Sequence, residues 1–269
     1  MADWDPELYN RFRRYRAEPV DEILRRLALG PSDRVVDLGC GSGENTVQIA
    51  RQIDQGSALG IDSSPAMIAA AESLRDGLDE PLKSHLEFRR ADLRDFNADR
   101  EYTVVFSNAA LQWVSDHRSV LAACYRALED GGALAVQMPA NEHETAQATI
   151  QAMAWSARWK GALGMMRTPS AETVLAPENY AAMLSQIGFV DVDCYYHTFH
   201  HPMASPVEVV EFVRATALRR FLEKLPPDQH PAFVGELTER LRRAYGTSGP
   251  VTFDFRRLFL WGRRPQNGS

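Results

Sequence analysis

Cysteine is scarce in this chain of 269 residues. Cys40, Cys124 and Cys194 lie far apart with no paired spacing, which argues against a disulfide framework or a zinc site and favours a reducing compartment. An excess of positive charge is also absent, because the formal net charge is -6. That balance argues against the broad basic surface with which proteins bind nucleic acid, so we expect no nucleic-acid partner.

Long apolar runs are missing as well. No stretch approaches the ~18 apolar residues of a membrane span, and residues 1–16 contain no apolar signal-peptide core. The hydrophobic content of 45% still allows the chain to bury a full core. We therefore expect a cytoplasmic globular protein, a monomer or homodimer, with no membrane partner.

Short apolar runs alternate with helical patterns through most of the chain. Ser64 and Pro65 are typical of the start of a helix, as N-cap and first helical residue. Strands are expected at 34–38, 58–61, 86–88, 102–106, 133–138, 190–199 and 251–261, with a turn at Gly131-Gly132 before the fifth. Such alternation predicts an α/β fold with a doubly wound, mostly parallel, seven-stranded Rossmann-like sheet.

The alternation is interrupted twice by helical patterns. We expect one domain over residues 1–269, with helical cap insertions at 141–175 and 205–246 and an N-terminal helical lid at 1–30. No internal repeat or long linker divides the sequence.

The first strand leads into a glycine loop, Asp37-Leu38-Gly39-Cys40-Gly41-Ser42-Gly43, at the start of a helix. The glycines allow a tight turn and a close approach of the backbone to a ligand. The spacing G-x-G-x-G differs from the pyrophosphate fingerprint, and Asp37 would repel phosphates but suits the ammonium of an amino acid.

Two further acids follow later strands. Asp62 ends the second strand, where a carboxylate can accept hydrogen bonds from both hydroxyls of a ribose. Asp92 ends the third strand and can accept the exocyclic amine of adenine. Each acid alone can be a solvated helix cap. Together they favour a nucleoside joined to an amino acid.

These motifs resemble class I methyltransferases that use S-adenosylmethionine and release S-adenosylhomocysteine. Further segments are similar to the bacterial trans-aconitate 2-methyltransferase family, whose members methylate a carboxylate of a small tricarboxylic acid. They are 1–6 with Leu8-Tyr9, 60–68, 109–113, 134–139 and 257–259. Ser42 and Glu44 depart from the loop residues expected for that family.

The resemblance implies a cofactor site and a methyl-transfer site. The expected cofactor-binding residues are Asp37, Gly39, Gly41, Gly43, Asp62, Ser63, Met67, Asp92, Leu93 and Asn108. Gln112 and Trp113 follow the fourth strand, and we expect them to form the catalytic wall between cofactor and substrate. A core position is the alternative for Trp113.

Methyl transfer to a carboxylate requires no base, because a carboxylic acid with a pKa near ~4 is already ionised at neutral pH. A polyanionic small-molecule substrate requires cations, and arginine binds carboxylates bidentately. The expected substrate-binding residues are Trp4, Tyr9, Arg16, His197, Arg219 and Arg257. Recognition of such a substrate is expected to depend on buried arginines in the cap and last strand, Arg219 and Arg257, and a surface charge is the alternative for each of them in this arginine-rich chain. The run His197, His200 and His201 lacks a completing ligand, so no metal site is expected.

Two alternatives remain open. One is an O-methyltransferase for a hydroxyl of another small metabolite, with His197 or His200 as the base. The other is a noncatalytic partner protein that binds the cofactor.

Overall fold

In this computed structural model of the protein, residues 12–214 and 216–266 are described, without the side chains of Arg13, Arg16 and Pro169. Seven strands form one sheet in the order β3-β2-β1-β4-β5-β7-β6. Their bounds are β1 Arg34–Leu38, β2 Ser57–Asp62, β3 Leu86–Arg90, β4 Tyr102–Asn108, β5 Leu128–Pro139, β6 Val190–Met203 and β7 Val251–Arg263. The pairs β1–β2, β1–β4, β2–β3 and β4–β5 are parallel. Seven strands at the expected places confirm the predicted sheet.

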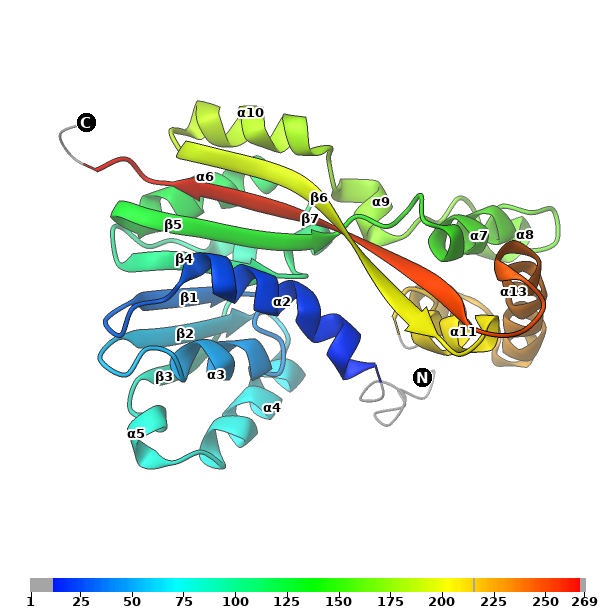
Figure 1. Ribbon diagram of the computed structural model, residues 1–269, viewed down its shortest axis with the longest axis horizontal. Coiled ribbons are helices and arrows are strands. Elements are labelled where there is room, and N and C mark those ends of the chain that lie inside the picture. The colour runs from blue at the N-terminus through cyan, green and yellow to red at the C-terminus, as the bar shows by residue number, and fades with distance from the viewer. Residues whose placement is uncertain (1–11, 215, 267–269) are drawn as a thin grey trace. The chain divides into compact units, whose positions relative to one another are not determined.

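Figure 1 shows β7 running opposite to β5 and β6. The helices are α2 Arg13–Leu27, α3 Glu44–Ala50, α4 Pro65–Asp76, α5 Glu80–Lys83, α6 His117–Ala127, α7 Thr145–Ala154, α8 Lys160–Leu163, α9 Pro169–Thr173, α10 Pro177–Ile187, α11 Pro206–Arg214, α12 Arg219–Lys224 and α13 His230–Tyr245. Three 3-10 helices are η1 Leu93–Asp95, η2 Leu111–Trp113 and η3 Pro227–Gln229.

The chain divides into two compact units. One, called here the sheet unit, consists of Pro19–Met138, Thr173–Tyr196 and the part that begins at Leu258. Its first strand carries the buried run Val35, Val36 and Leu38, as expected for a strand covered on both faces. α4 begins as predicted, because the Ser64 side chain accepts a hydrogen bond from the backbone N–H of Met67 and Pro65 follows it.

The predicted turn at Gly131-Gly132 does not precede β5 but lies inside it, as an irregularity of the strand. Gly131 has a φ angle of 82°, and the register with β4 shifts between the pairs Tyr102–Leu128 and Val104–Ala133. The Gly131 N–H donates to the Arg264 carbonyl oxygen at 3.0 Å, and the Arg264 N–H donates to the Gly132 carbonyl oxygen at 2.9 Å. This pairing with the end of β7 continues the strand through residues whose local preference favours a turn.

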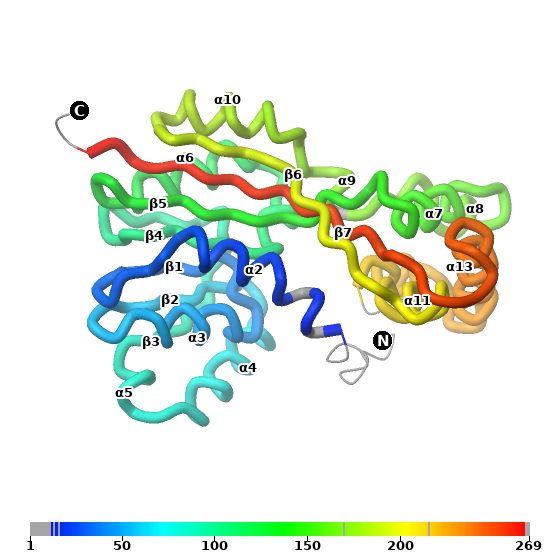
Figure 2. The backbone as a smooth tube through the Cα atoms, in the orientation of Figure 1, coloured from blue at the N-terminus to red at the C-terminus, as the bar shows by residue number. Residues whose placement is uncertain are grey.

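The other unit, called here the helical unit, consists of the described part of residues 1–18, Pro139–Glu172 and His197–Arg257. It has its own apolar core, which includes Phe233, Leu237 and Leu241 on one face of α13. Trp159 packs edge-to-face on Phe233 with ring centroids 4.9 Å apart. The helices α7, α8, α11 and α13 can be followed in Figure 2. The segments 141–175 and 205–246 contribute to this unit, and their role as a cap stays a prediction.

Candidate functional site

The glycine loop brings the backbone of the first strand close to its neighbours. Gly39, Gly41 and Gly43 have φ angles of 80°, 55° and 84°, a region that favours glycine. The Gly39 and Cys40 N–H groups donate to the Ile61 carbonyl oxygen at 2.8 and 2.9 Å. A Cβ atom on Gly39 would lie 2.2 Å from the Ala110 Cβ atom. The loop therefore tolerates only glycine at position 39.

Asp37 is almost fully buried at the base of this loop, with 1% of its surface exposed. The Thr46 hydroxyl of α3 donates to its Oδ2 at 2.7 Å. Burial raises the pKa of Asp37 to about 7, against the opposing effect of the Thr46 hydrogen bond. The carboxyl group is thus held inside the sheet unit.

The raised pKa predicts that Asp37 lowers stability as the pH rises. The folded state holds the proton up to about pH 7, whereas a carboxyl group in the unfolded chain loses it near pH ~4. The stabilising protonated form is therefore lost between these two values. We expect wild type to lose about 4 kcal/mol of unfolding free energy relative to Asp37→Asn over this range. Urea denaturation from pH 4 to pH 8 measures this, with Asp54→Asn on the surface as control; parallel curves for wild type and Asp37→Asn would contradict it.

Asp62 joins the glycine loop to the end of the second strand. Its Oδ2 accepts the Gly41 N–H at 3.0 Å and its Oδ1 accepts the Ser64 N–H at 2.8 Å. Each carboxylate oxygen has a second lone pair, so the group can still accept hydrogen bonds from a ligand. Ser63 and Met67 are exposed next to it.

Asp92 caps η1 and forms an ion pair with Arg94. Its Oδ1 accepts the Arg94 backbone N–H at 2.9 Å, and its Oδ2 lies 2.6 Å from the Arg94 guanidinium. The hydrogen bonds from Arg94 lower the pKa of Asp92 to about 2. A Cβ atom on Gly39 would lie 3.9 Å from Leu93 Cδ1, so this strand end borders the glycine loop. An adenine contact for Asp92 stays a prediction.

The end of β4 leads directly into η2. Ala109 has a φ angle of 54°, which is rare for a residue other than glycine, and its N–H donates to the Gln137 carbonyl oxygen at 2.9 Å. The buried Gln112 side chain donates through Nε2 to the Ala109 carbonyl oxygen at 2.7 Å. Trp113 is 68% exposed, so the alternative of a core position is wrong.

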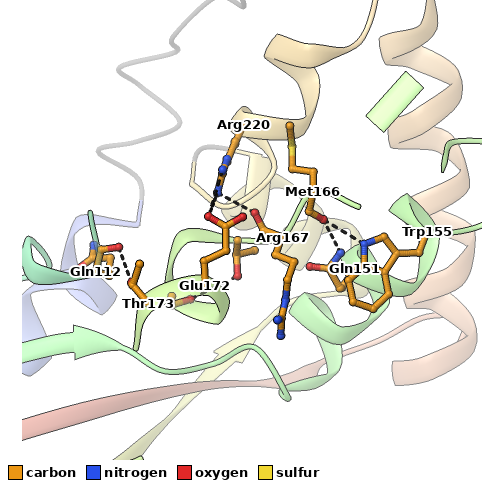
Figure 3. A network of polar contacts seen from close by, with 10 residues as sticks. Gln112, Gln151, Trp155, Met166, Arg167, Glu172, Thr173 and Arg220 are labelled. Atoms are coloured by element: carbon orange, nitrogen blue, oxygen red, sulfur yellow. Dashed lines mark hydrogen bonds and ion pairs between the residues drawn. The ribbon is translucent and has the colours of Figure 1, made fainter. Parts of the chain in front are cut away.

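Two contacts that the sequence did not predict fix η2 in place. The Thr173 hydroxyl donates to the Gln112 carbonyl oxygen at 2.8 Å (Figure 3). His117 Nε2 donates to the Leu111 carbonyl oxygen at 2.8 Å, and its Nδ1 pairs with the Tyr180 hydroxyl. No sequence pattern relates Thr173 or Tyr180 to this turn, because both lie more than 60 residues away along the chain.

In the helical unit, the predicted substrate-binding residues differ in exposure. Arg257 is 7% exposed, and its guanidinium carbon lies 3.7 Å from the centroid of the Phe255 ring. Arg219 is the opposite case: its side chain is 55% exposed and pairs with Glu223 at 2.7 Å. The expectation that Arg219 is buried is therefore wrong, because the i,i+4 pair lies on the surface of α12.

His197 is exposed and stacks on Phe199 with ring centroids 4.3 Å apart. Trp4, Tyr9 and the Arg16 side chain lie outside the described residues.

A polar network surrounds the carbonyl oxygens of Met166 and Arg167, in the Pro139–Glu172 segment of the helical unit. Arg220 donates to the Arg167 carbonyl oxygen at 2.8 Å and pairs with Glu172 at 3.2 Å. The Met166 carbonyl oxygen accepts hydrogen bonds from Gln151 and Trp155 (Figure 3). The carbonyl oxygens of 166–167 are thus held by side chains from α7, its C-cap Trp155 and α12.

Neither a cluster of metal ligands nor a helix that could span a membrane is present among the described residues. Within residues 12–214 and 216–266, no group of three or more His, Cys, Asp or Glu side chains lies close enough together to hold a metal ion. Among the same residues, no helix combines the length and apolar character needed to cross a membrane.

Comparison of the sequence with known families places a methyltransferase domain at residues 35–132, which includes the glycine loop and η2. Trans-aconitate 2-methyltransferase of Variovorax paradoxus is 34% identical over 267 residues, covering 98% of this chain and 96% of that protein. The enzyme of the same name from Methylobacterium radiotolerans is 36% identical, covering 98% and 96%. The one from Escherichia coli O157:H7 is 32% identical, covering 99% and 100%. The similarity therefore extends over both units.

Solved structures confirm the fold. The YcgJ protein of Bacillus subtilis has a TM-score of 0.62 at 14% identity, covering 92% of this chain and 98% of that one. Geranyl diphosphate methyltransferase, solved in complex with S-adenosylmethionine, has a TM-score of 0.58 at 14% identity, covering 96% and 88%. At this identity the likeness concerns the architecture, a doubly wound α/β sheet of the class I methyltransferase type.

Proposed function

Because this chain belongs to the trans-aconitate 2-methyltransferase family, we infer that it transfers a methyl group from S-adenosylmethionine. The proposed acceptor is a carboxylate of a small polycarboxylic acid such as trans-aconitate. The observation that carries the proposal is identity above 30% to such enzymes over nearly the full length of both partners. A relative that shared only the sheet unit, with its proposed cofactor site, would not also match the helical unit.

The sheet unit supplies the features that binding of the methyl donor requires. Glycine at position 39 lets the loop pack directly against Ala110, and at Gly41 a Cβ atom would meet nothing within 4 Å, so the backbone there is open to a ligand. Asp62 can accept the ribose hydroxyls, and Asp92 can accept the adenine amine. The buried Asn108 Oδ1 has no hydrogen-bond partner among the described residues, so it is available to a donor group of the ligand.

The chemistry is a displacement at the methyl carbon. A carboxylate oxygen of the acceptor forms the new bond to carbon as the bond from carbon to sulfur breaks and the sulfur keeps the electron pair. The acceptor is already ionised at neutral pH, so the protein need not remove a proton. Its contribution is to align the reacting atoms and to exclude water from a weak nucleophile. Gln112 and Trp113, on the turn fixed by Thr173 and His117, are the proposed wall of that site.

Arg257 is the proposed cation for the substrate carboxylate. Arg257→Lys keeps the charge but loses the planar guanidinium fork, so we expect the KM for trans-aconitate to rise about tenfold while the affinity for S-adenosylhomocysteine stays unchanged. Steady-state kinetics at two salt concentrations and calorimetric titration measure the two quantities.

Two matched substitutions separate this role from a general effect of charge. Arg242→Lys changes a partly exposed arginine that pairs with Glu239 on α13 and serves as the control. Arg219→Lys tests the other predicted arginine, for which its surface pair with Glu223 favours a smaller effect. Equal KM values for wild type and Arg257→Lys would exclude the proposed substrate contact of Arg257 without affecting the proposed reaction.

A hydroxyl acceptor is the second candidate, because His200 Nδ1 lies 2.7 Å from Asp254 Oδ1, an arrangement that can support a base. Screening of labelled methyl transfer to polycarboxylic acids and phenols distinguishes the two. We also propose a cytoplasmic enzyme, monomeric or homodimeric, that acts without nucleic acid.

A further inference from the structure

Gln137 lies beside the proposed methyl-transfer site, at the carboxyl end of β5. In the pairing of β4 with β5 it is the register partner of Asn108, and Phe106 pairs with Ala135. On the other side of β4, Phe106 pairs with Asp37 of β1. Paired residues of parallel strands, and residues two apart on one strand, project to the same face of a sheet. Asp37, Asn108 and Gln137 therefore share one face.

The side chain of Gln137 is buried but has an unused donor. It is 1% exposed, and its Nε2 has no hydrogen-bond partner among the residues that the structure describes. Two buried amide oxygens in the same region, Asn108 Oδ1 and Gln112 Oε1, also have none within that part of the chain. A buried amide atom without a partner is costly, so three such atoms near the ends of β4 and β5 and on η2 indicate that a ligand supplies the partners.

The backbone connects these groups into one site. The Gln137 carbonyl oxygen accepts the N–H of Ala109, and the Ala109 carbonyl oxygen accepts the side-chain N–H of Gln112. The next residue, Ala110, is the one that a side chain on Gly39 would strike. Gln137 therefore belongs to the same small region as the glycine loop and η2.

An amide nitrogen can only donate, so its partner must be an acceptor. Both substrates of the proposed reaction carry carboxylates, one on the amino-acid part of the methyl donor and one or more on the acceptor. A hydrogen bond to a carboxylate is charge-assisted and is stronger than one to a neutral oxygen. An amide donor is also uncharged, so it does not compete with the positively charged sulfonium for a carboxylate.

We propose that Gln137 is a carboxylate-binding residue of the active site, with its side-chain N–H groups donating to a carboxylate oxygen of one of the two substrates. The inference rests on the proposed function for the identity of the acceptor, but the methyl-donor carboxylate can be tested without it.

Gln137→Met tests the proposal, because methionine has a similar length and no donor. Loss of a hydrogen bond to a charged group is expected to weaken binding about 10- to 100-fold. The unliganded variant should melt at the same or a higher temperature than wild type, since a buried group without a partner is removed. Gln137→Glu, of equal size, should weaken binding further because it repels a carboxylate. Gln186→Met, on the surface of α10, is the control.

Two sets of measurements identify the carboxylate. Weaker calorimetric binding of S-adenosylhomocysteine, with unchanged binding of 5′-methylthioadenosine, which lacks the amino acid, assigns it to the methyl donor. A raised KM for trans-aconitate with unchanged S-adenosylhomocysteine affinity assigns it to the acceptor. The proposal is overturned if a folded Gln137→Met or Gln137→Glu variant changes both the S-adenosylhomocysteine affinity and the KM for trans-aconitate by less than twofold. If wild type methylates no polycarboxylate, the proposed function fails, and the calorimetric comparison alone then decides for or against Gln137.

Discussion

Gly39→Ala is expected to reduce the affinity for S-adenosylhomocysteine at least about a hundredfold and to lower the unfolding free energy by about 3 kcal/mol. The new Cβ atom would lie 2.2 Å from Ala110 Cβ, far inside contact distance, and the φ angle of 80° adds backbone strain. Neither group can rotate away, so the loop or the start of η2 must move. Calorimetric titration and urea denaturation measure the two effects.

Gly41→Ala is the matched control for this substitution. Its φ angle of 55° is also left-handed, but a Cβ atom there would meet nothing within 4 Å. We expect only the strain of the backbone, about 1 kcal/mol, and a smaller loss of affinity. Equal effects of the two substitutions would mean that backbone strain, and not the close approach of Gly39 to Ala110, limits the loop.

Asp62→Ala is expected to weaken S-adenosylhomocysteine binding by a hundredfold or more. The proposed hydrogen bonds from two ribose hydroxyls to the carboxylate are each worth about 1.5 to 3 kcal/mol. The substitution also removes the acceptor of the Gly41 and Ser64 N–H groups, so the glycine loop loses its connection to the second strand. Calorimetric titration of the folded variant gives the affinity, and its melting temperature reports the loss of the loop contacts.

Asp62→Asn separates the two contributions. It keeps one acceptor oxygen and nearly the same volume but removes the charge, so we expect an affinity between those of wild type and Asp62→Ala. Unchanged affinity in Asp62→Ala would exclude the ribose contact. A preference for NAD over the methyl donor in wild type would exclude the proposed cofactor itself.

Local sequence patterns predicted the elements that depend on local chemistry. The buried run of β1, the cap of α4 at Ser64 and the turn-forming glycines at 39, 41 and 43 all depend on neighbouring residues. The three acids were found because each lies in, or shortly after, an expected strand. Asp37, however, is almost fully buried, and its partner in the fold is Thr46, which local patterns did not indicate.

The remaining features depend on residues that only the tertiary structure brings together. Gly131-Gly132 reads as a turn until pairing with Arg264 continues the strand. The anchoring of η2 by Thr173 and the Tyr180 partner of His117 have no local signature. Arg219 is exposed in an ion pair with Glu223. This pair could have been recognised in the sequence, because opposite charges four residues apart on a helix form surface pairs. Gln137 was part of a family-like segment, but only its burial and unused donor distinguish it.

The most direct test of methyl transfer to a carboxylate is the reaction of the purified wild-type protein with S-adenosylmethionine labelled in the methyl group, trans-aconitate being the acceptor. The expected product is a monomethyl ester, whose label is released as methanol by mild base. Label in an ether of a hydroxyl acceptor, stable to base and absent from every polycarboxylic acid tried, would contradict the proposed reaction.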